Sequence, residues 1–500
     1  MRETTERRMA HPMIPDMFQT AESPEDRRAA RLFLIAITLY FAAQIVLRVT
    51  LGGALETDEA EMMLMTPGLR WGYGPQLPLY NWLQIGLFAL FGKTLFALSL
   101  LKNALLWGTY ALLFTGLRAA VPARTATLAT LSLFLIPDIA WEAERATTHS
   151  NMLLFAISAT ICAFLWALRT GALRHWALLG VALGIGGIAK YNYWAVPAGL
   201  LLALLTMPDL RRRLLTARAL PALVIAAAIV AGPYAWMAAN RDLALSSVGK
   251  IALENSARAW LPEGVPLYLK GLATLIVLPA LVTGALWLAT RRGTAPARVS
   301  PLSTLFLRMG GLLALGGLAA VWLSEAGHIA SRWLLPIVIP LVIGIFLRLA
   351  PRLGRGALRG YLAILGVVAA LVFAGLTYDR YKDGARRDVE FAPLVSVIED
   401  MHLPEDTVIV ADFYVGGNLA RLRPDWPVRS DLPASAREVE TRNLLLLTRE
   451  KNAEVLRRVT ARVDWRHAQG AAFGEPTDFS LPSRHGARPL NILLQHARAE

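Results

Sequence analysis

The sequence predicts a mainly α-helical membrane protein, in which a bundle of spanning helices is followed by a small C-terminal α/β domain. Composition is the first reason, since 55% of the 500 residues are hydrophobic and 18% are charged, with a mean hydropathy of +0.44. Apolar runs recur along residues 31–378, and beyond Tyr378 the chain becomes charged and mixed. These three features exclude a series of ordinary soluble domains.

The spans follow from the apolar runs. A helix crosses a bilayer with about 20 mostly apolar residues, because hydrocarbon offers no partner for free backbone groups. About eleven segments meet or approach that length, at residues 31–52, 94–117, 125–141, 150–168, 175–189, 193–207, 219–238, 267–290, 303–323, 333–347 and 359–377. The stretch from Asn81 to Phe91 is too short to cross and is expected to lie along the membrane interface.

The basic residues predict the orientation. Lys and Arg exceed Asp and Glu by 14, and arginines gather in alternate connections and in the N-terminal arm, residues 1–30. By the positive-inside rule these segments face the cytoplasm, so the positive charge indicates topology and no nucleic-acid partner is expected. The arm lacks an apolar core with a cleavage site, so the first span is expected to be an uncleaved anchor. The abundance of Arg, Ala and Leu favours a bacterial inner membrane.

An odd number of spans places the C-terminal domain, residues 379–500, on the periplasmic side of the membrane domain, residues 31–378. Strand-like runs at Thr407–Ala411, Leu444–Thr448 and Leu490–Leu494, with a helix-like stretch at Lys451–Val463, predict a small α/β fold. The one cysteine, Cys162, lies in an apolar run. An intrachain disulfide, a Cys-rich zinc site and an iron–sulfur cluster are therefore excluded.

Carboxylates gather directly after the first span, in the sequence Glu56-Thr57-Asp58-Glu59-Ala60-Glu61. Asp58 and Glu61 are three residues apart and would share one face of a helix, while Glu59 would point elsewhere. Burial beside lipid raises a carboxylate pKa and a nearby cation lowers it, so this segment is suited to a general base. The alternative is that the acids only favour the dipole of a helix N-terminus.

Other polar residues mark the same predicted outer ends of the spans. Lys190, followed by Tyr191, is either a cation for a lipid phosphate or a lysine snorkelling within an aromatic belt. Arg332 and His328 share one short loop, where Arg332 is equally suited to be an interfacial anchor. Lys102 lies inside the second predicted span, where a charge is costly and indicates function.

His149 belongs to a further cluster of acidic, basic and hydroxyl residues at 141–151. Beside Asp58 or Glu61 it would suit a divalent cation, although no HExxH-type spacing supports a metal site. No cofactor is therefore assigned, and a divalent cation is left open. A nucleophilic triad has no better support, since no serine lies in a recognisable elbow.

Taken in order, several motifs resemble the GT-C class of membrane glycosyltransferases, in particular the branch of protein O-mannosyltransferases and bacterial lipid A aminoarabinose transferases. The motifs are the Asp58-Glu59 pair, the Gly-Pro-x-x-Pro-Leu-Tyr-x-Trp run at 74–82, Phe91-Gly92-Lys93, Ala189-Lys190-Tyr191 and Arg332-Trp333-Leu334-Leu335-Pro336. The resemblance covers roughly residues 31–350, and Val408 to Leu419 is also similar to bacterial members. No single motif is specific, but their order is.

The resemblance implies an inverting enzyme that moves a sugar, a hexose or a pentose, from a polyprenyl-phosphate donor to a lipid, glycan or protein acceptor on the outer face. By position, Asp58 matches the catalytic acidic residue and Glu59 its paired partner, while Lys190 and Arg332 match basic positions near the donor phosphate. We add Lys102 to the expected phosphate-binding residues. The expected contacts to sugar or acceptor are Glu61, Tyr80, His149, Tyr191 and His328.

The sequence departs from the family at three places. Lys102 stands where many members carry Arg, Trp333 stands where Tyr is usual, and His149-Ser150-Asn151 stands where an Asp often occurs. These departures bear on the identity of the sugar and the acceptor more than on the class of reaction.

Two other functions compete with the transferase. A transporter or flippase of a lipid-linked sugar would place ionisable groups near mid-membrane and often shows paired halves, whereas apart from Lys102 the predicted spans are nearly free of charge. A noncatalytic membrane scaffold with an outer domain is the other alternative, and it gives the Asp58 segment no role.

Overall fold

The computed structural model describes residues 23–214, 216–246, 262–290, 300–430, 443–449, 472–486 and 488–498. Within these residues, eight helices are long and apolar enough to cross a membrane, or nine if one bent pair is a single span. The eight are Pro24–Leu51, Leu95–Leu117, His149–Thr170, Ala217–Ala239, Gly264–Thr290, Pro301–Ser324, Ser331–Arg352 and Arg355–Tyr381. The predicted multi-pass helical bundle is confirmed.

The helices of the membrane part follow one another along the chain. In chain order they are α1 (Pro24–Leu51), α2 (Thr57–Leu64), α3 (Leu79–Phe91), α4 (Leu95–Leu117), α5 (Ala123–Leu131), η1 (Ser132–Leu135), η2 (Asp138–Glu142), α6 (Ala143–Arg145), α7 (His149–Thr170), α8 (Leu173–Gly187), η3 (Tyr191–Trp194), α9 (Ala195–Leu205), α10 (Pro208–Leu214), η4 (Ala217–Ala219), α11 (Leu220–Ala239), α12 (Arg241–Ala244), α13 (Gly264–Thr290), α14 (Pro301–Ser324), η6 (Ser331–Leu334), α15 (Leu335–Leu349), η7 (Ala350–Arg352) and α16 (Arg355–Tyr381). The predicted interfacial stretch 81–91 forms α3.

The predicted total of about eleven spans is not confirmed. Predicted spans 175–189 and 193–207 correspond to α8, which has 15 residues, and to α9, which has 11 residues. Both are shorter than the roughly 20 residues of a bilayer-crossing helix. The predicted span 125–141 corresponds to the bent pair of helices described in the next paragraph. The first span also differs from the prediction, since α1 begins at Pro24, within the predicted N-terminal arm. It begins there because Ser23 caps the helix by accepting the Asp26 backbone N–H.

The bent pair joins Ala123–Leu135 to Asp138–Arg145 at an angle of 82°. The break coincides with Pro137, whose ring and missing N–H interrupt a regular helix. Beyond it, η2 is a π-helical turn, a form that is common at functional sites. The bend therefore turns the acid-bearing residues 138–145 away from the direction of a straight span.

The described part of the C-terminal domain contains one mixed sheet and two α-helices. Its elements are η8 (Arg386–Asp388), α17 (Ala392–Asp400), β1 (Val408–Ala411), α18 (Phe413–Leu422), β2 (Val428–Ser430), β3 (Asn443–Arg449), β4 (Ala472–Phe473), β5 (Thr477–Leu481) and β6 (Leu490–Arg498). The strand order is β2-β1-β3-β6-β4, with β5 also paired to β6. β1 runs parallel to β2 and β3, while β3 and β6 are antiparallel.

Three of these strands agree with the sequence. β1, β3 and β6 match the runs at 407–411, 444–448 and 490–494, because each is a short apolar run with turn residues nearby. The side chains of Leu444, Leu445, Leu446 and Leu447 are all buried, as expected for a central strand. The predicted helix Lys451–Val463 lies outside the described residues.

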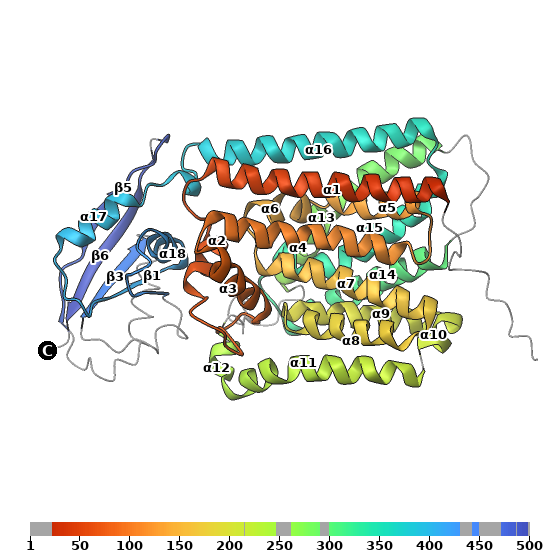
Figure 1. Ribbon diagram of the computed structural model, residues 1–500, viewed down its shortest axis with the longest axis horizontal. Helices are drawn as coiled ribbons and strands as arrows, with labels where there is room; N and C mark the ends of the chain where they lie inside the picture. The colour runs from red at the N-terminus through yellow and green to blue at the C-terminus, as the bar shows by residue number, and fades with distance from the viewer. Residues whose placement is uncertain are drawn as a thin grey trace, which may run out of the picture.

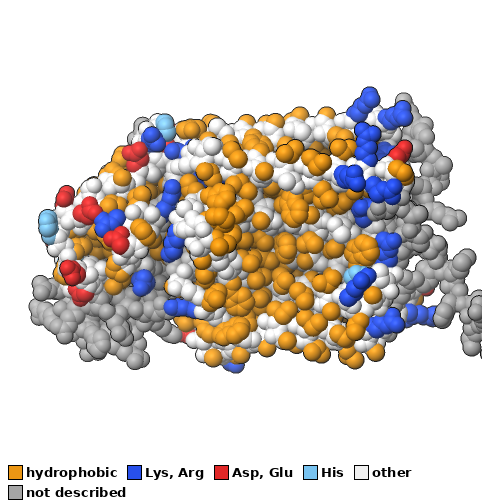
Figure 2. All heavy atoms as spheres, in the orientation of Figure 1, with side chains coloured by type: hydrophobic (Ala, Val, Ile, Leu, Met, Phe, Trp, Pro, Cys, Tyr) orange, Lys and Arg blue, Asp and Glu red, His pale blue; other side chains and the backbone are white. Residues whose placement is uncertain are grey.

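The bundle has two different ends, seen in Figure 1. α2, α3 and the C-terminal domain lie at one end, which we call the domain end, while the start of α1 lies at the other. Figure 2 shows a broad hydrophobic band between the ends and a gathering of Lys and Arg at the end where α1 starts, which we call the basic end. Hydrogen bonds tie connections together at the basic end, from Arg218 to the Gly171 carbonyl (2.8 Å) and from Arg308 to the Thr206 carbonyl (2.6 Å).

The C-terminal domain is packed directly onto α2. The Leu55 backbone N–H donates to the Asn418 side chain (2.8 Å), which in turn donates to the Leu55 carbonyl (3.3 Å). A Cβ at Gly417 would lie 2.3 Å from the Ala60 carbonyl oxygen, so only glycine allows α18 to approach α2 this closely. The segment that carries the predicted catalytic acid is therefore held from the C-terminal side of the chain.

Candidate active site

The helix α2 forms because its first turn satisfies its own backbone groups. Glu56 and Glu59 make a capping box, in which the Glu59 carboxylate accepts the Glu56 N–H at 3.1 Å. The other end is fixed by side chains from the next segments, since Lys93 donates to the Met63 carbonyl (3.0 Å) and Asn81 to the Met65 carbonyl (2.6 Å). Both ends of α2 are thus fixed by hydrogen bonds, which hold Asp58 and Glu59 in position.

Glu59 is buried in a cluster of cations. Arg48, near the end of α1, donates to both Glu59 oxygens, at 2.9 and 2.7 Å. Arg387 Nη2 lies 3.9 Å from the same carboxylate. Burial by itself raises the pKa of Glu59, but Arg48 and Arg387 more than offset it and leave this pKa well below its ordinary value. Glu59 therefore stays ionised and is held in place.

Lys102 belongs to this cluster as well. Its Nζ lies 4.0 Å from Glu59 and donates to the Glu144 backbone carbonyl at 2.6 Å. The structure thus places Lys102 beside Glu59, away from the cavity described next. Glu56, at the start of α2, faces Arg145 (3.7 Å) and Arg387 (3.9 Å), and burial raises its pKa in spite of these cations.

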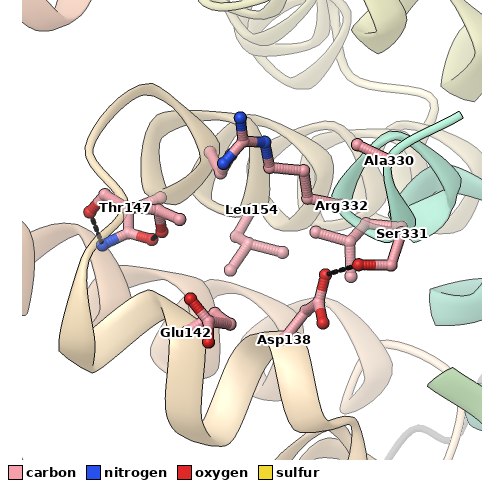
Figure 3. A pocket seen from close by; sticks show the side chains of 10 residues that line it. Asp138, Glu142, Thr147, Leu154, Ala330, Ser331 and Arg332 are labelled. Atoms are coloured by element: carbon pink, nitrogen blue, oxygen red, sulfur yellow. Dashed lines mark hydrogen bonds between the residues drawn. The ribbon is translucent and has the colours of Figure 1, made fainter. Parts of the chain in front are cut away.

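A cavity of about 140 Å³ opens at the domain end, where the bent pair meets α7 and η6. It is lined by Asp138, Glu142, Thr147, Ser150, Asn151, Leu154, Ala330, Ser331, Arg332 and Leu335. Figure 3 shows Arg332 reaching over the cavity on one side, with the carboxylates of Asp138 and Glu142 pointing in from the other. Ser331 donates to Asp138 at 2.8 Å. The 82° bend is what brings the two acids here.

Lys190 borders this cavity through Ser150, to whose hydroxyl it donates at 2.7 Å. Burial and the charge of Arg332 lower the pKa of Lys190 to about 8, although Asp58 and Asp138 act in the opposite direction. The charges of Asp58, Asp138 and Arg332 all influence the pKa of Lys190, but of these four residues only Asp138 and Arg332 line the cavity. Of the predicted base and phosphate-binding cations, Arg332 lines the cavity and Lys190 contacts it through Ser150, whereas Asp58 and Lys102 are not among the lining residues.

Tyr80 and His149 pack against each other and are not among the residues that line the cavity. Their rings are 5.2 Å apart and both side chains are buried. Burial raises the pKa of Tyr80, and so do Glu59 and Asp58. Neither ring nitrogen of His149 has a hydrogen-bond partner among the described residues. A buried imidazole in that state is available to a ligand hydroxyl.

The remaining predicted contacts are placed differently. Glu61 is buried on α2. Tyr191 directs its hydroxyl toward the Met237 sulfur of α11, at 4.0 Å, and His328 packs edge-on against Trp333, with 5.8 Å between ring centroids. Neither Tyr191 nor His328 lines the cavity.

Several residues of this region are missed by sequence reasoning. Asp138 and Ser331 line the cavity, and Asp138 can be placed there only once the bend at Pro137 is known. Four other lining residues belong to the polar cluster at 141–151 that the sequence singles out, namely Glu142, Thr147, Ser150 and Asn151. Arg48 offers a usable signal, because an arginine inside a span is as costly as Lys102. Arg387 offers none, since it lies in the C-terminal domain far along the chain.

For a divalent cation, the described residues contain no group of three or more His, Cys, Asp or Glu side chains arranged to hold a metal. His149, considered with Asp58 or Glu61 for this role, stacks against Tyr80 instead.

Comparisons with known proteins agree with this architecture. A sequence model of the family Dolichyl-phosphate-mannose-protein mannosyltransferase matches residues 74–236. The lipopolysaccharide core galacturonosyltransferase RgtA of Rhizobium johnstonii is 31% identical over 417 residues, which are 80% of this chain and 82% of the relative. RgtB of the same organism, also named a lipopolysaccharide core galacturonosyltransferase, is 29% identical over 436 residues, covering 84% and 87%.

Among solved structures, ArnT from Cupriavidus metallidurans bound to undecaprenyl phosphate has a TM-score of 0.56 at 14% identity, covering 91% of this chain and 97% of that one. The same protein in its apo state gives the same TM-score over 92% of this chain. This likeness concerns the fold.

A multi-pass helical bundle that carries a small α/β domain at one end is the fold that this chain shares with ArnT. The extent and identity of the match to RgtA make the assignment more specific. The chain belongs to the GT-C family of membrane glycosyltransferases.

Proposed function

We propose that this chain transfers a sugar, with inversion, from a polyprenyl-phosphate donor to the lipopolysaccharide core on the periplasmic face of a bacterial inner membrane. The observation that carries the proposal is the cavity lined by Arg332, which Lys190 contacts through its hydrogen bond to Ser150, with the charge of Asp58 acting on Lys190. The proposal takes the domain end as the periplasmic end, because the opposite end gathers the Lys and Arg residues.

The chemistry needs one base and a few cations. The acceptor hydroxyl oxygen attacks the anomeric carbon, the bond from that carbon to the phosphate oxygen breaks, and the hydroxyl proton passes to Asp58. The departing polyprenyl phosphate gains a negative charge, which Lys190 and Arg332 stabilise. General-base help contributes on the order of 10²–10⁴ in rate, and cations placed at the developing charge add to it.

Glu59 acts through position in this scheme. Arg48 donates to both of its carboxylate oxygens, so Glu59 stays ionised near neutral pH and is not suited to exchange a proton. Its role in this scheme is to hold the helix α2, which carries Asp58. His149, with both ring nitrogens free of described partners, is assigned to a sugar hydroxyl. Lys102, 4.0 Å from Glu59, is assigned to the same positioning role as Arg48.

The donor and acceptor classes come from the relatives. RgtA and RgtB are named for galacturonic acid and for the lipopolysaccharide core, and ArnT, which has the same fold, was solved with undecaprenyl phosphate. A uronic acid is therefore the first sugar to test.

The test uses the purified full-length protein in detergent, radiolabelled polyprenyl-phosphate galacturonic acid and lipopolysaccharide core. We expect label in the core fraction with wild type and none with Asp58→Asn. A flippase, the alternative function, gives no labelled core in detergent, where there is no second compartment. Label that appears equally with Asp58→Asn would reject Asp58 as the base, and mass spectrometry of envelope glycans with and without the protein would identify a different sugar or acceptor.

A further inference from the structure

A second cavity lies where the membrane bundle meets the C-terminal domain. It has a volume of about 270 Å³ and is formed by the α1–α2 connection, the end of α16, η8, the start of α17, α18 and the segment at Arg484. Four arginines line it, from four different parts of the chain: Arg380, Arg387, Arg421 and Arg484. The cavity is separate from the Asp138 cavity, with which it shares no lining residue.

The arginines of this cavity keep unused donors. Arg387 is 2% exposed, and its buried Nε has no hydrogen-bond partner in the described chain. Arg421 donates from Nη1 to the Gly53 carbonyl at 2.9 Å, and it forms no ion pair within 4.0 Å to a carboxylate of the described residues. A buried guanidinium with open donors is costly unless a ligand fills them.

The acids in the lining balance only part of the charge of these arginines. Asp388 accepts from Arg380 (2.6 Å), His485 Nδ1 (2.7 Å), the His485 N–H (2.8 Å) and the Gly486 N–H (3.0 Å), so its oxygens are already engaged. Glu390 lies 3.9 Å from Arg484. Arg387 faces Glu56 and Glu59 of α2, each at 3.9 Å. Arg421 is then the lining arginine that has no ion pair within 4.0 Å among the described residues, so the uncompensated positive charge of the cavity lies there.

This second cavity is also close to α2, the helix that carries Asp58. Arg387 lines it and at the same time lies 3.9 Å from both Glu59 and Glu56. Arg421 is near enough to Arg48 and Glu59 for both to influence its pKa, which burial lowers. A group bound here would therefore lie one layer of side chains from α2.

We propose that this arginine-lined cavity binds an anionic group, a phosphate or a carboxylate, carried either by the acceptor glycan or by a membrane phospholipid beside it. The inference rests on the proposed function and adds to it a recognition site for negative charge on the acceptor side. Arginine suits this role because its planar fork of donors matches the two oxygens of such groups.

The test compares Arg421→Gln with Arg423→Gln in the full-length protein. Arg423→Gln loses the same charge two residues further on, but Arg423 pairs with Glu399 and Asp425 at the surface and does not line the cavity. Transfer is measured in nanodiscs of phosphatidylcholine alone or with phosphatidylglycerol. If the acceptor supplies the anion, Arg421→Gln raises the acceptor KM about tenfold in both nanodiscs, with kcat and donor KM unchanged.

If a phospholipid supplies the anion, phosphatidylglycerol stimulates the wild type and Arg423→Gln but not Arg421→Gln. Arg484→Gln provides a second variant that cannot disturb the core, because the Arg484 side chain is 66% exposed. Like Arg421→Gln, it should raise the acceptor KM if the acceptor supplies the anion, or reduce the stimulation by phosphatidylglycerol if a phospholipid does. Equal behaviour of all three variants in both nanodiscs overturns the inference. Absence of transfer by the wild type would instead contradict the proposed function.

Discussion

Asp58 and Glu59 are neighbours on α2, but their surroundings differ. Glu59 is 4% exposed and is clamped by Arg48 at 2.7 Å, whereas Asp58 acts electrostatically on Lys190 at the border of the cavity. Successive residues on a helix point about 100° apart, so Glu59 enters the packed side of α2 while Asp58 is only partly buried. We call the side of Asp58 the ligand side, because the proposed function assigns the base to it. The difference teaches that two adjacent carboxylates of one sequence motif can have unlike surroundings, one fully ion-paired and buried and the other partly exposed.

The largest expected effect tests the ligand side. Asp58→Asn should lower kcat by about 10²–10⁴ and leave the thermal unfolding temperature unchanged, because Asp58 is assigned to the reaction. Transfer of radiolabelled sugar in detergent and fluorescence-detected unfolding measure the two quantities. Normal transfer by Asp58→Asn would contradict the assignment of Asp58 as the base.

The packed side should respond in the opposite way. Glu59→Gln leaves Arg48 buried without the carboxylate that it pairs with, which costs about 3–5 kcal/mol of unfolding free energy. The unfolding temperature should therefore fall, and activity should fall with it. Replacing both partners, as Arg48→Met with Glu59→Met, should recover part of the stability, because Arg48 is then no longer a buried cation without its anion. Equal stability of Glu59→Gln and wild type would contradict a structural role.

The cations of the cavity can be separated from Lys102. Lys190→Met should raise the donor KM by about tenfold or more, since a charge-assisted hydrogen bond to phosphate contributes about 1.5–3 kcal/mol. Lys102→Met should lower stability instead and leave the donor KM nearly unchanged. If Lys102→Met altered donor binding as strongly as Lys190→Met, Lys102 would return to the phosphate site that we expected from the sequence.

The link to the C-terminal domain is expected to matter less. Asn418→Ala removes both hydrogen bonds to Leu55, which costs about 1–3 kcal/mol, and it should lower kcat with little change in either KM. The matched control is Asn491→Ala, because Asn491 is exposed on β6 and the same side chain is lost there without any contact to α2. Equal kcat for both variants would show that α2 is held without the Asn418 contact.

The smallest effect concerns pH. Lys190 has a pKa of about 8, so it is protonated below that value and loses its charge as the pH rises through it. The donor kcat/KM should therefore decline above about pH 8, by up to tenfold per pH unit. Lys190→Arg should abolish this decline, because arginine stays charged. A pH profile that is the same for both proteins would exclude Lys190 as the titrating cation.

The sequence predicts much of this arrangement and misses a definable part. Asp58, Lys190 and Arg332 can be grouped because each lies at the same end of a predicted span, and topology alone brings such ends together. The depth of Lys102 indicates function, but the sequence does not reveal that Glu59 and the Glu144 carbonyl are its neighbours. Contacts between α2 and residues beyond 380 depend on packing over the whole chain, which no local pattern records.

The contact between Leu55 and Asn418 joins residues 363 positions apart. During synthesis the ribosome has to deliver residue 418 before this contact can form, long after α1 and α2 have emerged. Every described membrane helix precedes that point in the chain. A nascent protein with its bundle already inserted still lacks the last support of its α2 helix, so the synthesis of α18 sets the earliest moment at which the finished active site can exist.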